Sequence, residues 1–134
     1  MCGIVGFYNV SCLKSRATDG FATIQHRGVE GSGFLASKLD GSDFFYLRRG
    51  SLAKSLCDSD EFYRWEDRET RIAIEHVRFG TSGSPADLRN IQPFMHFTRW
   101  GKLAVAHNGD RLDTQTVRQT FLDGGMVFES DSDS

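Results

Sequence analysis

Four short segments of this chain carry side chains able to take part in nucleophilic chemistry. The first is Cys2, which stands directly behind Met1 and is followed by Gly3. The other three are His26-Arg27-Gly28, His76-Val77-Arg78 and His107-Asn108-Gly109. Each has an ordinary structural interpretation as well as a chemical one, so their combination matters more than any one of them.

Cys2 would become an unusual nucleophile if Met1 were removed, since one residue would then carry a thiol and a free α-amine. A free thiol titrates near ~8.5 and an α-amine near ~7.7–8.0, so a proton could pass between them near neutral pH. N-terminal threonine hydrolases use their own amine in this way. On its own, Cys2 could equally be a small buried apolar residue.

Arg78 stands at the end of an apolar run and precedes the loop Gly80-Thr81-Ser82-Gly83. Its guanidinium could bind a carboxylate through two parallel hydrogen bonds, as in recognition of an amino acid, or could form a surface ion pair. His26-Arg27-Gly28 suits the end of a helix, with basic side chains at the negative pole and glycine as the stop.

Asn108-Gly109 also has two interpretations. The asparagine amide and the glycine N–H could together stabilise an oxyanion during acyl transfer. The same dipeptide is a common tight turn.

Other chemistries lack support in the sequence. There is no phosphate-binding loop with its lysine, no His-Glu-x-x-His pattern and no Gly-x-Ser-x-Gly elbow. The three cysteines, Cys2, Cys12 and Cys57, have no metal-type spacing and are odd in number, which argues against a zinc site and a disulfide scaffold. We therefore expect no metal and a reducing, cytoplasmic environment.

Charge and hydropathy narrow the range of partners. The formal net charge is −2, which gives no reason to expect nucleic acid or an anionic membrane as a partner. No apolar run is long enough to cross a bilayer, and the N-terminus does not have the pattern of a signal peptide.

The 134 residues, 39% of them hydrophobic, suffice for one core, so we expect a single domain over 1–134. Short runs rich in β-branched and aromatic residues predict six strands: Ile4–Tyr8, Gly33–Lys38, Phe44–Arg49, Ile72–Arg78, Phe94–Phe97 and Leu103–His107. Helices are expected from Asp19 to Gln25 and from an N-cap at Asp113 to Gly124, the second burying Val117, Phe121 and Leu122. Ile72-Ala73-Ile74 and Leu103–Ala106 lack polar alternation, which predicts strands covered on both faces.

Taken in order, five segments resemble the glutaminase domain of class II glutamine amidotransferases, which are N-terminal-nucleophile hydrolases. These segments are Cys2-Gly3-Ile4-Val5-Gly6, His26-Arg27-Gly28, His76-Val77-Arg78, Gln92-Pro93-Phe94 and His107-Asn108-Gly109. The resemblance implies an α+β fold, an αββα sandwich. Family domains continue well past the aspartate that Asp133 matches, so we expect only the N-terminal part of the domain, truncated at its C-terminal end.

The resemblance also implies roles for individual residues. Cys2 would attack the side-chain carboxamide of L-glutamine, forming a thioester, while Asn108 and the N–H of Gly109 would hold the oxyanion.

Four further residues would serve substrate binding. Arg78 would bind the α-carboxylate and Asp133 the α-ammonium group. Arg27 would support the nucleophile's end of the pocket, and Thr81 belongs to the loop after the arginine.

Within the family, three segments most resemble the branch that passes ammonia to phosphoribosyl pyrophosphate in purine biosynthesis: Leu47-Arg48-Arg49-Gly50, Gly80-Thr81-Ser82-Gly83 and Asn90-Ile91-Gln92-Pro93-Phe94. That branch implies a separate transferase domain with magnesium, absent from this segment, and a homo-oligomer at full length. No cofactor is expected in the segment itself. Two alternatives stay open: a catalytically inactive amino-acid-binding or interaction module, and a glutaminase domain serving glucosamine 6-phosphate or asparagine synthesis.

Overall fold

The main body of the molecule is a four-stranded antiparallel sheet in the order β1-β4-β2-β3. The computed structural model describes residues 1–80, 87–109 and 113–130. The strands are β1 (Gly3–Tyr8), β2 (Gly31–Ser37), β3 (Phe44–Arg49) and β4 (Ile72–Arg78). Because β1 pairs antiparallel with β4, Gly3 lies opposite Val77, and the N-terminus meets the end of β4.

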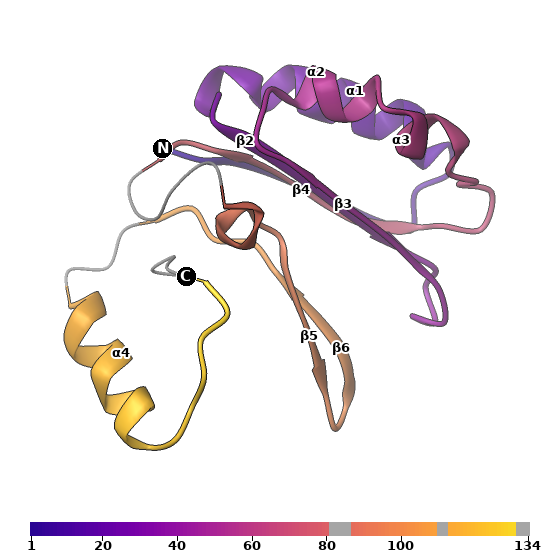
Figure 1. Ribbon diagram of the computed structural model, residues 1–134. Helices are drawn as coiled ribbons and strands as arrows, with labels where there is room; N and C mark the ends of the chain where they lie inside the picture. Colours follow the sequence, from indigo (N-terminus) through magenta and orange to yellow (C-terminus); the bar gives the residue numbers. More distant parts are fainter. Residues whose placement is uncertain (81–86, 110–112, 131–134) are drawn as a thin grey trace.

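Three helices cover one face of this sheet, as Figure 1 shows: α1 (Leu13–Ile24), α2 (Ala53–Cys57) and α3 (Asp60–Arg64). The 3-10 turn η1 (Gln25–Arg27) extends α1 and ends at Gly28, as predicted. The predicted start at Asp19 was wrong. The helix begins at Leu13 because Leu13, Ala17, Phe21 and Ile24 follow helical spacing and are all buried against the sheet.

Aromatic side chains fill the space between this helical layer and the sheet. The ring of Phe34 lies 5.5 Å from that of Phe62 and 5.2 Å from that of Trp65, and Phe45 stacks on Trp65 at 4.9 Å. Helix α3 starts at Ser59, whose hydroxyl accepts the N–H of Phe62. This cap turns Phe62 into the core.

The opposite face of the sheet carries a two-stranded hairpin, β5 (Phe94–Thr98) and β6 (Gly101–Val105), which follows the short 3-10 turn η2 (Leu88–Asn90). Sheet and hairpin enclose a cavity of about 270 Å³ whose lining includes Leu35, Ile74, Met95 and Ala104. The Gln92-Pro93 peptide bond is cis, and the Gln92 carbonyl packs so closely on Gly33 that no Cβ would fit there. This contact fixes the hairpin to β2.

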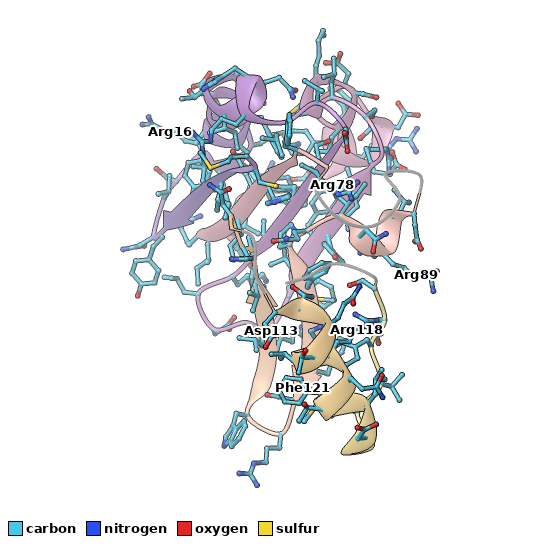
Figure 2. The ribbon with its side chains drawn as sticks, turned by 90° about the vertical axis from the view of Figure 1, so that its left-hand side faces the viewer. Arg16, Arg78, Arg89, Asp113, Arg118 and Phe121 are labelled. Atoms are coloured by element: carbon cyan, nitrogen blue, oxygen red, sulfur yellow. The ribbon has the colours of Figure 1, made fainter. Side chains whose placement is uncertain are left out.

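The fourth helix, α4 (Thr114–Asp123), lies on the side of the sheet away from α1–α3 (Figure 1). It starts after Asp113, as predicted, but none of its residues is buried, so the predicted burial of its apolar side chains was wrong. The helix packs on the C-terminal segment instead. Phe121 lies 6.3 Å from Phe128, and Arg118 donates to the Ser130 carbonyl at 2.8 Å (Figure 2).

Strand β6 also differs from its prediction. It was expected to be covered on both faces, yet Leu103 is 51% exposed and Val105 is also exposed. The reason is that β6 pairs only with β5 among the described residues. In the other run with the same prediction, Ala73 is buried but Ile72 and Ile74 are half-buried, while β4 is fully buried from Glu75 to Arg78. The predicted α+β class is confirmed by the sheet with its helical layer.

Candidate active site

Cys2 lies where β1 begins, against the backbone of the residue that follows Arg78. The thiol sulfur accepts the N–H of Phe79 at 3.4 Å and lies 3.7 Å from the Phe79 carbonyl oxygen. The next residue must be glycine, because a Cβ on Gly3 would lie 2.9 Å from Val77 Cγ2. Met1 is 76% exposed and is not part of the buried core.

The His26-Arg27-Gly28 segment touches both Cys2 and the end of β4. Arg27 Nε donates to the Cys2 carbonyl at 3.0 Å. A Cβ on Gly28 would lie 2.6 Å from the Arg78 carbonyl group, so only glycine permits this approach. The segment therefore serves as a helix stop and also as a support for Cys2.

The guanidinium of Arg78 is buried, with its side chain 5% exposed, and Figure 2 shows it among the elements while Arg89 extends at the periphery. Its Nη1 lies 3.5 Å from Glu30 Oε2. The Glu30 carboxylate in turn packs on Gly80 and leaves no room for a Cβ there. A surface ion pair is therefore excluded. Burying a charge is costly unless it has partners, so this position suits a carboxylate-binding arginine.

Asn108 and Gly109 follow β6 and are exposed. Their position is set through His107, whose N–H donates to Gln92 Oε1 at 2.5 Å. The His107 ring lies on the Gly109 backbone, where a Cβ would come within 2.5 Å of Nε2. Since Gln92 packs on Gly33 and Gly33 pairs with His76, the turn is attached to the sheet two residues before Arg78.

Two predicted site residues, Thr81 and Asp133, lie outside the described residues. The structure thus brings Cys2, Arg27 and the end of β4 together: Arg27 contacts Cys2, the Cys2 thiol contacts Phe79, and Gly28 packs on the Arg78 carbonyl. It brings Asn108 and Gly109 to the same face of the sheet through Gln92.

His76 occupies the centre of this face, fully buried between Ile4 of β1 and Gly33 of β2. Burial, and after it the positive charge of Arg78, lowers the pKa of His76 to about 4. The ring is therefore neutral at physiological pH and adds no second positive charge beside Arg78.

Sequence reasoning missed three residues that shape this region. Gln92 and Glu30 reach their partners only through tertiary contacts; the sequence marked Gln92 within the segment Gln92-Pro93-Phe94 but gave it no role of its own. Glu75 could have been found, because it is a carboxylate inside a predicted buried strand; burial raises its pKa to about 9.

No set of three or more histidine, cysteine, aspartate or glutamate side chains is arranged to hold a metal ion within the described ranges. In the same ranges, no helix combines the length and apolar character needed to cross a membrane.

Comparison with known proteins gives a consistent group of relatives. The amidophosphoribosyltransferase of Methanocaldococcus jannaschii is 33% identical over 100% of this chain and 28% of its own length. Amidophosphoribosyltransferase 2, chloroplastic, of Arabidopsis thaliana is 32% identical over 99% of this chain and 23% of its own. The amidophosphoribosyltransferase of Staphylococcus aureus is 31% identical over 99% of this chain and 26% of its own length. No family model matches.

Solved structures agree with these relatives. The glutamine phosphoribosylpyrophosphate amidotransferase of B. subtilis, complexed with ADP and GMP, superposes with a TM-score of 0.81 at 25% identity, covering 99% of this chain and 27% of that one. A structure described as the allosteric regulatory enzyme of purine biosynthesis gives a TM-score of 0.79 at 23% identity, covering 97% and 27%, and supports the fold.

This chain spans about a quarter of the length of the relatives that it matches. The predicted architecture, the N-terminal part of an N-terminal-nucleophile αββα sandwich, is confirmed by the structural match. The chain is homologous along its whole length to amidophosphoribosyltransferases, and its resemblance to the glutaminase domain of class II glutamine amidotransferases is thereby confirmed.

Proposed function

We propose that this chain hydrolyses the side-chain amide of glutamine, giving glutamate and ammonia. One observation carries the proposal: antiparallel pairing of β1 with β4 sets the Cys2 thiol on the backbone of Phe79, the residue that follows Arg78 with its buried guanidinium. A nucleophile beside a carboxylate-binding group suits an amino-acid substrate with a reactive amide.

The chemistry starts once Met1 has been removed. The α-amine of Cys2 takes the thiol proton, and the thiolate attacks the carboxamide carbon of glutamine. The carbonyl electron pair moves onto oxygen, where the Asn108 amide and the Gly109 N–H stabilise the negative charge. Preorganised donors of this kind contribute roughly 2.7–4 kcal/mol each to acyl transfer.

The tetrahedral intermediate then breaks its C–N bond. The α-ammonium of Cys2 returns the proton to the leaving nitrogen, ammonia departs, and a cysteinyl thioester remains. Water adds to the thioester, the C–S bond breaks, and glutamate leaves with the thiol restored. All protons and electron pairs are supplied by substrate, water and Cys2.

Substrate recognition depends on charge. Arg78 binds the α-carboxylate, which must share or displace the contact now made by Glu30 at 3.5 Å. Asp133 binds the α-ammonium group, and Thr81 contributes from the loop after β4. Arg27 holds the Cys2 carbonyl and so keeps the nucleophile in place.

We infer the ammonia acceptor from the relatives. They are named amidophosphoribosyltransferases, so the acceptor is phosphoribosyl pyrophosphate and the product phosphoribosylamine in purine biosynthesis. That step, its magnesium and a homo-oligomeric assembly belong to a longer protein of which this chain is one part. The cytoplasm stays our predicted compartment, although two plant relatives are named chloroplastic.

Glutamine hydrolysis by the protein that begins at Cys2 tests this proposal, with Cys2→Ala as the matched control. We expect glutamate and ammonia from the first protein and none above background from the second. A Cys12→Ala variant should hydrolyse glutamine like the unchanged protein, because Cys12 is an exposed residue before α1.

A second candidate is an amino-acid-binding or interaction module without catalysis. The contact between Glu30 and Arg78 favours it, since a resident carboxylate already compensates the buried charge. Equal rates for the unchanged protein and Cys2→Ala would favour this module over the enzyme.

A further inference from the structure

We propose that Gln92 is a positioning residue that holds the Asn108–Gly109 turn in the geometry needed for oxyanion binding; this inference rests on the proposed glutaminase function. Gln92 does not touch the nucleophile in the proposed mechanism. It acts through His107, the residue immediately before the turn.

The contact between Gln92 and His107 is short and partly buried. Gln92 Oε1 accepts the His107 N–H at 2.5 Å, and the Gln92 residue is 5% exposed. A hydrogen bond sheltered from water is stronger than one at the surface, and leaving one partner unpaired is correspondingly costly. The orientation of the His107 peptide is therefore coupled to the Gln92 side chain.

The backbone of Gln92 is itself packed against the sheet. Its carbonyl packs on Gly33 of β2, where any side chain would collide, and the neighbouring Pro93 carbonyl accepts the Tyr46 hydroxyl at 2.6 Å. Through Gln92, the turn is therefore held against β2 in the centre of the sheet.

The orientation of the His107 peptide determines where the two proposed oxyanion donors lie. Asn108 and Gly109 are exposed, and the His107 ring lies against the Gly109 backbone. A rotation of the His107 peptide would carry both proposed donors with it. A donor must lie within hydrogen-bond distance of the developing oxyanion, so a small displacement removes most of its effect.

Three variants of the protein that begins at Cys2 test the inference. Gln92→Met keeps the length of the side chain but removes the acceptor. Gln92→Glu keeps an acceptor oxygen at nearly the same place. Gln119→Met makes the same Gln-to-Met change on exposed α4, where the Gln119 amide donates to Asp123 Oδ1 at 2.7 Å.

We expect Gln92→Met to lower kcat for glutamine by about 10²-fold with KM changed by less than about threefold, because donors aimed at the oxyanion act in the transition state. Gln92→Glu should recover most of kcat, and Gln119→Met should lose none. Alkylation of Cys2 by iodoacetamide, which builds no oxyanion, should be equally fast in all three. A kcat for Gln92→Met within about threefold of the unchanged protein, or a loss confined to KM, overturns the inference.

Amide hydrogen exchange measured by NMR on the unchanged protein separates this inference from the proposed function. The His107 amide should exchange much more slowly than those of Asn108 and Gly109. Fast exchange at His107 overturns the positioning contact even if glutamine is hydrolysed. Slow exchange in a protein that does not hydrolyse glutamine rejects the proposed function and leaves the contact established.

Discussion

Arg78 carries a buried charge in the proposed site. A substitution can test whether its guanidinium, and not only a positive charge, is required. Arginine offers a planar set of donors that fits a carboxylate, whereas lysine is a compact point charge. Burial makes that difference larger than it would be at the surface, because water cannot replace the lost hydrogen bonds.

We therefore expect Arg78→Lys to raise KM for glutamine by about ten- to a hundredfold, as loss of a charge-assisted hydrogen bond predicts, with a smaller change in kcat. Initial-rate measurements over a range of glutamine concentrations give both constants. Arg89→Lys is the matched control, since Arg89 is 69% exposed and pairs with Asp87 away from the site. An unchanged KM in Arg78→Lys would contradict the assigned role.

At the scale of the elements, Glu75 of β4 packs against α1, and burying its carboxyl group there is unfavourable. Its carboxylate is fully buried beneath Gly20 of α1, where no Cβ would fit, and neither oxygen has a hydrogen-bond partner among the described residues. Burial raises the pKa of Glu75 from its usual value near 4.5 to about 9, so the folded protein keeps it protonated at neutral pH.

The sign of the pH dependence follows from proton binding. Between pH 4.5 and 9 the unfolded chain has lost this proton while the folded chain retains it. The free energy of unfolding therefore falls as the pH rises through this window, by at most about 1.4 kcal/mol per pH unit for this group. The contribution of the Glu75 proton to the free energy of unfolding is fully present below pH 4.5 and is lost above pH 9.

We expect Glu75→Gln, which has a similar volume and no charge, to flatten this dependence. Urea denaturation at pH 5 and pH 8 measures the difference in each protein. Glu66→Gln, at an exposed position, should keep the slope of the unchanged chain. Equal slopes for Glu75→Gln and the unchanged chain would show that Glu75 is ionised in the folded state.

Element prediction succeeded where the signal is local. The run Ile72–Arg78 and the run Phe44–Arg49 form β4 and β3 with the predicted bounds, because each is rich in β-branched or aromatic residues. Helices α2 and α3 were not predicted, since five residues each are too few to show helical periodicity.

The site was predictable in part for the same reason. Cys2, Arg78 and Asn108-Gly109 stand in recognisable local patterns. The roles of Glu30 and Gln92 could not be predicted, because they arise only when the loop after η2 packs on β2 and the segment after η1 meets β4. Tertiary contacts of this kind leave no trace in local sequence.

At the scale of the whole molecule, the two halves differ in how well they are buried. The sheet and α1–α3 share a continuous core, whereas the hairpin exposes Phe97, Trp100 and Leu103. Exposed apolar patches are unusual on isolated domains. The proposed site lies at the junction of the two halves, with Cys2 and Arg78 on the sheet and Asn108 attached through Gln92.

Such a site exists only in the folded molecule, which makes selective reaction among its three cysteines a test of the whole arrangement. Cys57 is partly buried, and burial raises the pKa of its thiol to about 11, so its thiolate is rare at neutral pH. Cys12 is exposed but lies before α1, away from Arg78 in the chain's packing.

The most direct test is therefore to treat the folded protein that begins at Cys2 with a diazoketone analogue of glutamine and to locate the added mass by peptide mass spectrometry. We predict one adduct, on Cys2, suppressed by excess glutamine and formed more slowly in the Arg78→Lys variant at the same reagent concentration. An adduct on Cys12 or Cys57 with Cys2 unmodified would contradict the account.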